Sequence, residues 1–164
     1  MNRIVLRYLL LITILAVNIS CDRVSKTIVR NSITENEMIP VIENFVTLTN
    51  VENTGAFLSA GSNLPKTIKF ILLTLLPIAA LSAGLFIMFR KSDYSLAMRI
   101  GIGFLVGGGI GNIYDRLLFG SVTDFMHIDF QLFQTGIFNF ADVSVMMGMI
   151  IIFTESYRKR YSMN

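Results

Sequence analysis

The chain of 164 residues has few charged side chains, one cysteine and one histidine. Charged residues make up 15% of the sequence and hydrophobic residues 53%, a balance outside that of a soluble domain of this length. A single cysteine, Cys21, cannot form an internal disulfide. With His127 as the sole histidine and no HExxH motif, a zinc hydrolase would have almost no ligands. We therefore expect a membrane protein without a metal ion or other cofactor.

Four apolar stretches are about long enough to cross a bilayer. The purest of them includes residues 70–89, which carry no charged side chain. Pro77 lies inside this stretch and is a point where the helix could kink, a fault that neighbouring helices can absorb in a membrane. We predict spans at about residues 4–21, 68–89, 98–119 and 137–157, within one membrane domain of residues 1–164.

The first stretch also has the basic start and apolar middle of a cleavable lipoprotein signal. Two observations favour an uncleaved span. Asn18 stands three residues before Cys21, where such signals have an aliphatic residue, and cleavage would leave an odd number of spans. We expect the segment to remain as the first membrane helix.

Basic residues cluster on one side of the four spans. The loops on the opposite side, roughly 22–65 and 120–136, hold more acidic than basic residues. Because Lys and Arg favour cytoplasmic loops, we expect both termini in the cytoplasm. The net charge of +3 then reflects membrane topology, and no nucleic-acid partner is needed to explain it. The basic residues on the predicted cytoplasmic side are Arg3, Arg7, Arg90, Lys91, Arg99, Arg158, Lys159 and Arg160.

The loop between the first two spans contains the stretch "IPVIENFVTLTNVENTGAFLSAG", which is rich in Val, Ile, Thr and Phe. These residue types and their partial alternation indicate short strands rather than a helix. We expect a small β layer on the outer membrane face, in a loop long enough to be functional.

Three glycines in the third span, Gly103, Gly107 and Gly111, are spaced four residues apart and form one smooth helix face. In a bilayer such a stripe lets two helix backbones approach closely, and we expect it to do so here. The run has neither GxGxxG spacing nor the lysine of a P-loop, so a nucleotide site fits poorly.

Polar residues gather at the predicted outer ends of the spans. Spacings of three and four residues place pairs of them on common helix faces. Each one alone has an ordinary explanation, such as a snorkelling arginine, a helix cap or a surface ion pair. Seven at one depth indicate a functional site instead. They are Asp22 and Lys26 after the first span, Asn112 and Arg116 in the third, Asp124 in the following loop, and Asn139 and Asp142 in the fourth.

Two of these residues, Asp124 and Asp142, suit acid and base chemistry. Two nearby carboxylates can share a proton, because one negative charge raises the pKa of the other group. The ionised group can activate water, while the protonated group polarises a scissile carbonyl and assists the leaving amine. The pair titrates as a unit, so the proton belongs to neither residue alone. A serine and lysine pair, made from Ser25 or Ser59 with Lys26, is a minor alternative.

Four sequence blocks follow one another in an order that a known family shares. They are "DRVSK", "NVENTGAF", "GGGIGNIYDRLLFGSVTDF" and "FNFADVSVMMG". Together they closely resemble lipoprotein signal peptidase, the bacterial signal peptidase II family. Leu58 and Gly109 stand where the family commonly has Ser and Ala, and neither position touches the acid pair.

The resemblance implies a mainly α-helical membrane fold, with four transmembrane helices, a small extracytoplasmic β cradle and a short peripheral helix. It implies an aspartic endopeptidase of the bacterial inner membrane, active near its extracytoplasmic face and as a monomer. Such an enzyme removes signal peptides from prolipoproteins that carry diacylglycerol on the lipobox cysteine, cutting just before that cysteine. Its partners would be these substrates and membrane lipid. Asp124 and Asp142 would be the catalytic dyad, supported by Asp22, Lys26, Asn53, Gly55, Gly108, Asn112, Arg116, Asn139 and Ala141.

Two other functional classes fit the composition. A small transporter or channel would also place charged and amide side chains among glycine-rich helices. A membrane assembly factor would use the outer loop to bind a partner and would need no catalytic residues. Solute flux without peptide cleavage would favour the transporter, and partner binding with neither activity would favour the assembly factor.

Overall fold

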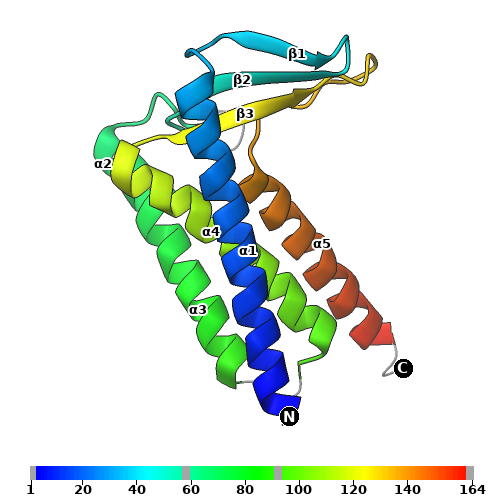
Figure 1. The fold of residues 1–164 in the computed structure, drawn as a ribbon. Coiled ribbons are helices and arrows are strands. Elements are labelled where there is room, and N and C mark those ends of the chain that lie inside the picture. The colour runs from blue at the N-terminus through cyan, green and yellow to red at the C-terminus, as the bar shows by residue number, and fades with distance from the viewer. Residues whose placement is uncertain (1–2, 57–59, 91–93, 162–164) are drawn as a thin grey trace.

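The structure, a computed structural model, describes residues 3–56, 60–90 and 94–161. Long helices form a bundle, and a three-stranded sheet lies across one end of it (Figure 1). Four helical stretches are long and apolar enough to cross a membrane, so the chain is a multi-pass membrane protein. They are Tyr8–Ser32, Lys66–Phe86, Leu96–Phe119 and Phe140–Tyr161.

The first helix, α1 (Arg3–Ser32), extends well beyond the predicted end at residue 21. Asp22 and Lys26 therefore lie inside the helix and not after it. Both side chains are fully buried, with 2.8 Å between Lys26 Nζ and Asp22 Oδ2. A charged pair four residues apart on one helix face can be buried where each charge has a partner, and this allows the helix to continue.

The second membrane helix consists of α2 (Lys66–Phe70), η2 (Ile71–Leu75) and α3 (Leu76–Arg90). The middle segment is a π-helical turn, in which the Leu76 N–H donates to the Ile71 carbonyl. Pro77 has no N–H to donate in the next helical position, and the widened turn directly precedes it. The predicted irregularity at Pro77 thus takes the form of a π turn, and the helix begins two residues before the predicted span.

The third helix, α4 (Leu96–Phe119), occupies the centre of the bundle. In the most apolar part of the candidate membrane-spanning stretch of α4, 44% of the residues are buried, against 6% to 17% in the corresponding parts of the other spans. The Ser95 hydroxyl caps its first turn by accepting from the Met98 N–H at 3.1 Å. Gly120 ends it in the left-handed region, with φ of 75°, a conformation that glycine adopts without strain. These two caps fix the helix close to the predicted span.

The glycine stripe on α4 packs against α1, which confirms the predicted close approach. A Cβ placed on any of the three glycines would come within 2.5 to 3.2 Å of an α1 side chain. From one contact to the next, the residue number increases by four on both helices, so the two helices run parallel. The α1 partners are Ile14 for Gly103, Asn18 for Gly107 and Asp22 for Gly111.

Gly109 and Leu58 are the two positions at which the sequence differs from the pattern of the family it resembles, and the structure describes only Gly109. Gly109 faces α3, and a Cβ there would collide with the Leu81 side chain. Glycine at this position therefore suits the leucine that packs on it. Leu58 lies outside the described residues.

The sheet contains β1 (Met38–Ile42), β2 (Val46–Asn53) and β3 (Val122–Ile128) in antiparallel order β1-β2-β3. The first two strands confirm the predicted β layer. The third strand was not predicted, and it places Asp124 in a strand opposite Val51 rather than in a loop. A bulge in β2 between Leu48 and Val51 presents Asn50, whose Nδ2 donates to the Ile33 carbonyl at 2.9 Å. This bond ties the sheet to the end of α1.

The fourth membrane helix, α5 (Phe140–Tyr161), begins three residues later and ends four residues later than the predicted span. Ahead of it the backbone is extended, and the Phe138 N–H donates to the Met126 carbonyl at 2.9 Å. The pairing holds the start of α5 beside β3. Among the described residues no short peripheral helix occurs apart from the four membrane helices, whereas the resemblance implied one.

Candidate active site

Asp124 on β3 and Asp142 in the first turn of α5 line one small cavity where the sheet meets the helices. Its volume is about 10 Å³, close to the space that a single water molecule occupies. Segments distant in sequence meet here. The lining residues are Asn53, Ala56, Asn112, Arg116, Val122, Asp124, Ile137 and Asp142.

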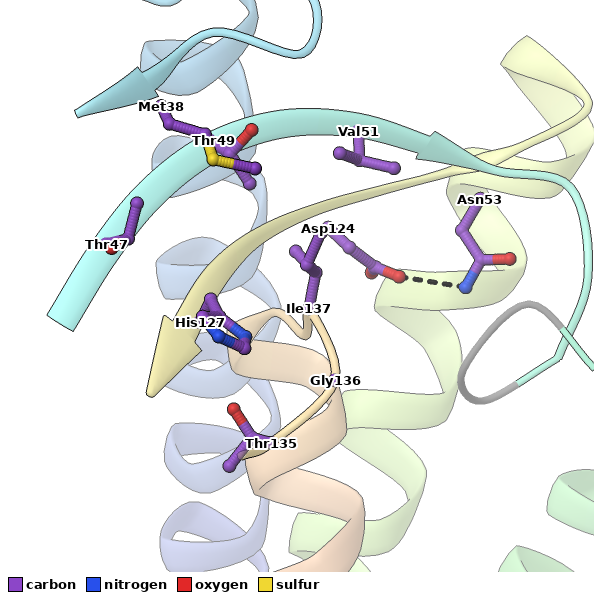
Figure 2. A pocket seen from close by; sticks show the side chains of 10 residues that line it. All are labelled: Met38, Thr47, Thr49, Val51, Asn53, Asp124, His127, Thr135, Gly136 and Ile137. Atoms are coloured by element: carbon purple, nitrogen blue, oxygen red, sulfur yellow. Dashed lines mark hydrogen bonds between the residues drawn. The ribbon is translucent and has the colours of Figure 1, made fainter. Parts of the chain in front are cut away.

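A larger groove leads to the same carboxylate. It has a volume of about 440 Å³ and runs beneath β2 and β3, with Asp124 and Asn53 at one end and His127 and Thr135 at the other (Figure 2). Asp124 lines both the groove and the small cavity. An extended peptide in the groove would therefore reach the cavity at Asp124.

Asn53 is the first of three asparagines that hold the aspartates. Its Oδ1 accepts from the Gly55 N–H at 2.9 Å, which fixes the orientation of the amide. Its Nδ2 consequently faces Asp124 and donates to Oδ2 at 2.9 Å. The Gly55 carbonyl in turn accepts from Arg116 Nη2 at 3.0 Å, so the turn after β2 is held beside the cavity.

Asn139, the second asparagine, caps α5. Its Oδ1 accepts from the Asp142 N–H at 3.0 Å, and Asp142 Oδ2 accepts from the Asn139 N–H at 3.2 Å. This reciprocal pair resembles a capping box, with aspartate in the third helical position. The remaining amide group donates from Nδ2 to Asp124 Oδ1 at 2.6 Å. One asparagine thus contacts both aspartates.

Asn112 on α4 is the third asparagine. Its Oδ1 accepts from Lys26 Nζ at 3.0 Å, and its Nδ2 donates to Asp142 Oδ1 at 2.8 Å. All three amides have their oxygen bound to a donor, so each presents its NH₂ group to a carboxylate. Among the described residues, no Lys or Arg forms an ion pair with Asp124 or Asp142.

These surroundings change how Asp124 holds a proton. Burial raises its pKa from 3.8 to about 6, and the nearby charge of Asp142 acts in the same direction. The amides of Asn53 and Asn139 act against this rise because they stabilise the ionised form. A carboxyl with this pKa can exchange a proton close to neutral pH.

A second cluster of buried charges lies behind the site. Lys26 Nζ lies 2.8 Å from Asp22 and 2.9 Å from Asp115, and all three side chains are fully buried. Arg23 also pairs with Asp115, as does Arg30 at 3.3 Å. We name this group the ion-pair cluster: Asp22, Arg23, Lys26, Arg30 and Asp115. It reaches the candidate site through the bond from Lys26 to Asn112.

The remaining predicted positions shape the backbone around the site. Asp22 Oδ1 accepts from the Ala141 N–H at 3.1 Å and so satisfies a free donor at the start of α5. A Cβ on Gly108 would collide with the Ala141 carbonyl. Small residues at these two positions let α4 and α5 approach closely. All eleven predicted site residues therefore lie at or next to one site.

Neither alternative chemistry gains support from the structure. The Ser25 hydroxyl donates to the Asp22 carbonyl at 2.9 Å, and Lys26 is held between two carboxylates, so they form no nucleophile and base pair. Ser59 lies outside the described residues. Within the described ranges, no group of three His, Cys, Asp or Glu side chains is placed to hold a metal ion.

The sequence did not reveal the roles of Asp115, Arg23 and Arg30. Arg23, Lys26 and Arg30 are spaced three and four residues apart, which places them along one helix face. That signal was hidden because the first helix was predicted to end at residue 21. With the true helix end, the same spacing would have predicted a basic face opposite Asp115.

Comparison with known protein families supports these observations. The model of the family described as signal peptidase (SPase) II matches residues 14–158, which is most of the chain. The chain belongs to the signal peptidase II family. Membership makes it an enzyme of the signal peptidase II type, a membrane protease. This assignment favours the peptidase over the transporter and the assembly factor.

Individual relatives agree over nearly their full length. The lipoprotein signal peptidase of Clostridium acetobutylicum is 32% identical over 142 residues, covering 86% of this chain and 89% of the relative. That of Desulfitobacterium hafniense is 35% identical over 144 residues, covering 85% and 89%.

Solved structures agree with the fold. A bacterial membrane enzyme determined by the in meso method at 2.3 Å resolution superposes with a TM-score of 0.84 at 27% identity, covering 94% of this chain and 91% of the other. A second such enzyme, at 1.9 Å resolution, gives 0.72 at 27% identity, covering 88% and 90%. Both solved chains thus have the same overall architecture as this family member.

Proposed function

We propose that this chain is a lipoprotein signal peptidase that cleaves diacylglyceryl-modified prolipoproteins with Asp124 and Asp142 as its catalytic pair. The observation that carries the proposal is their common position on a cavity the size of one water molecule, at the end of a peptide-sized groove. The names of the similar proteins support the choice of substrate.

In the proposed reaction the two carboxyls hold one proton between them. The ionised carboxylate takes a proton from water, and the resulting hydroxide attacks the scissile carbonyl. The protonated carboxyl donates a hydrogen bond to the carbonyl oxygen as negative charge develops there. Collapse of the tetrahedral intermediate releases the amine of the cysteine, which leaves with a proton. Water is consumed, and no covalent enzyme intermediate forms.

The supporting residues have positioning roles in this proposal. Asn53, Asn112 and Asn139 keep the carboxylates in place with neutral donors, which leave the shared proton free to move. Arg116 holds the turn at Gly55 beside the cavity. Because Asn53 and Ala56 on either side of this glycine line the cavity, the turn would contact the substrate backbone near the scissile bond.

The proposed location is the bacterial inner membrane, with both termini cytoplasmic and the sheet on the extracytoplasmic face. The basic residues near Arg160 support this orientation. A reporter fused after Arg160 should read as cytoplasmic, and one inserted near Asn63 as extracytoplasmic. The opposite readings would place the dyad on the side where an exported precursor is absent. We further propose that the whole chain acts as one domain and as a monomer.

The substrate's lipid should matter to turnover and not only to affinity. Two acyl chains hold the modified cysteine at the membrane interface, with about 0.8 kcal/mol gained for each buried CH₂. This fixes the scissile bond level with the site, so that binding energy supports orientation at the reacting carbonyl.

The deciding experiment incubates the purified protein with matched precursors, with and without diacylglycerol, at saturating concentration in one bilayer. A gel shift reports cleavage. We expect rapid cleavage of the lipidated precursor and a large deficit for the other. Equal turnover would make the protein a general membrane aspartic protease, and no cleavage of either precursor would refute the proposed activity.

A further inference from the structure

A second pocket at the sheet end of the bundle is distinct from the proposed groove. It has a volume of about 460 Å³ and lies between the start of the second membrane helix and the end of α4. We name it the basic pocket, because three cations line it. The cations are Lys66, Lys69 and Arg116.

The charged side chains that line this pocket all have the same sign. Lys66, Lys69 and Arg116 contribute positive charge, and the described lining contains no carboxylate. Lys69 Nζ donates to the Ser62 carbonyl at 3.1 Å, which uses one of its three N–H groups and holds the side chain at the pocket. Acidic residues otherwise predominate in the loops at this end of the bundle. Two lysines here therefore run against the charge bias that sets the topology.

The apolar walls indicate what kind of anion fits. Phe70 and Phe119 are about half exposed, and Leu73 lies one turn deeper along the second helix. All three residues lie on helical stretches that are long and apolar enough to cross a membrane. Thr74, in the π-helical turn, is 2% exposed and adds a hydroxyl to the lining. The pocket thus combines phosphate-binding cations with a surface for the glycerol and the first methylenes of an acyl chain.

We propose that the basic pocket binds the headgroup of an anionic phospholipid, with Lys66 and Lys69 as its phosphate partners. The ammonium groups would form charge-assisted hydrogen bonds to the phosphate oxygens. The ligand differs from the diacylglyceryl group of the proposed substrate, which carries no charge. The binding site is therefore a lipid site beyond the proposed peptidase reaction, next to the small cavity with which it shares Arg116.

The absence of tryptophan from the sequence gives a direct assay. The variant Phe119→Trp places a single tryptophan on the wall of the basic pocket. Its quenching by brominated phosphatidylglycerol, relative to brominated phosphatidylcholine in otherwise equal bilayers, measures lipid preference at this position. Each lysine near an anionic headgroup should favour the anionic lipid by about fivefold. Water and salt screen these charges because the pocket is partly open, so the effects of the two lysines should not multiply in full. We therefore expect a preference of at least about fivefold in the Phe119→Trp variant.

Matched variants show whether the lysines cause the preference. In the Phe119→Trp background, Lys66→Gln with Lys69→Gln should lower the preference at least about fivefold, whereas Lys66→Arg with Lys69→Arg should keep it. Arg116 in the lining and Arg30 over the ring of residue 119 are common to all these variants. Arg158→Gln with Arg160→Gln removes equal charge from the other end of the bundle and should change nothing at this position. A reference variant, Met146→Trp, reports an exposed site on α5 twelve residues before Arg158 and should show little preference.

Three results would overturn the proposal. They are equal quenching by the two lipids in the Phe119→Trp variant, an undiminished preference in the double glutamine variant, and loss of the preference when millimolar inorganic phosphate is added. The last would indicate a site for a free anion instead of a lipid. If the double glutamine variant does not fold, Lys66→Gln alone provides the test, because the bond from Lys69 to Ser62 remains. Failure of the peptidase assay would leave this measurement unaffected.

Discussion

Two neighbouring carboxylate pairs in this protein are buried in different ways. Asp22 and Asp115 are surrounded by Lys26, Arg23 and Arg30 in the ion-pair cluster. Asp124 and Asp142 instead accept hydrogen bonds from neutral amides. Cations compensate the negative charge of the first pair, whereas the second pair has neutral donors, and burial raises the pKa of Asp124 to about 6. The first pair is suited to fixing structure, and the second to exchanging a proton.

The largest expected effect is on catalysis by the amide-bound pair. Asp124→Asn and Asp142→Asn should each lower cleavage of a lipidated precursor by about 10³-fold or more, because asparagine cannot exchange a proton. Gel-shift assays of the purified variants in one bilayer measure this. Both variants should remain folded and bind the precursor. Near-normal turnover in either variant would remove that residue from the mechanism. It would also contradict the distinction between the cation-paired and the amide-bound carboxylates.

Within the ion-pair cluster, the corresponding substitution should act on stability. Asp115→Asn removes the carboxylate that Arg23 and Lys26 share, and leaves buried positive charge uncompensated. We expect a loss of about 3 to 5 kcal/mol in the free energy of unfolding. Unfolding of the protein in detergent by heat or denaturant, compared with the parent chain, reports this loss. The folded Asp115→Asn variant should still cleave the precursor, because Asn112 keeps its bonds to Lys26 and Asp142. Complete loss of activity in folded protein would argue that the ion-pair cluster is catalytic as well as the Asp124 and Asp142 pair.

The raised pKa of Asp124 also makes stability depend on pH. Its pKa is about 6 in the folded protein and 3.8 as the ordinary value, so the folded state holds the proton more tightly than the unfolded state. The resulting contribution is fully present below pH 3.8 and is lost as pH rises through about 6, a change of about 3 kcal/mol. Asp124→Asn should remove this part of the pH dependence. Parallel unfolding curves for both proteins between about pH 4 and pH 7 test it, and an unchanged difference across this range would contradict the raised pKa.

A smaller effect should follow from removing one amide. Asn53→Ala deletes a hydrogen bond that stabilises ionised Asp124, so the pKa of Asp124 should rise further. Because the proposed pair needs one shared proton, the alkaline limb of the pH–rate profile should move upward by about one unit. Asn50→Ala on the same strand is the control, since Asn50 bonds to Ile33 and not to the site. A profile that moves equally in both variants would mean that the shift reflects general loosening of the sheet.

The sequence predicted the membrane character because it depends on composition and on uninterrupted apolar length. Both are properties of single segments and do not depend on tertiary contacts with other segments. The third span was predicted within two residues for the same reason. The first span was cut short at residue 21 because Asp22 and Lys26 look like a helix end when their partners are unknown. Their burial depends on Asp115, which is far away in the sequence.

Local spacing also predicted which side chains share a helix face, such as Asn139 with Asp142. It could not predict β3, whose pairing with β2 joins segments far apart in the sequence, such as Val51 with Asp124. That pairing determines which face of the strand Asp124 occupies and therefore where its carboxylate points.

By itself, the sequence determined the four membrane helices, the family blocks and the residues available for chemistry, because these follow from local composition and motif. The tertiary structure alone decided which carboxylates are paired with cations and which with amides. That choice rests on contacts between distant segments: Lys26 with Asp115, and Asp124 with both Asn53 and Asn139. Burial together with neutral donors then sets the proton affinity of Asp124, a property that exists only in the folded chain.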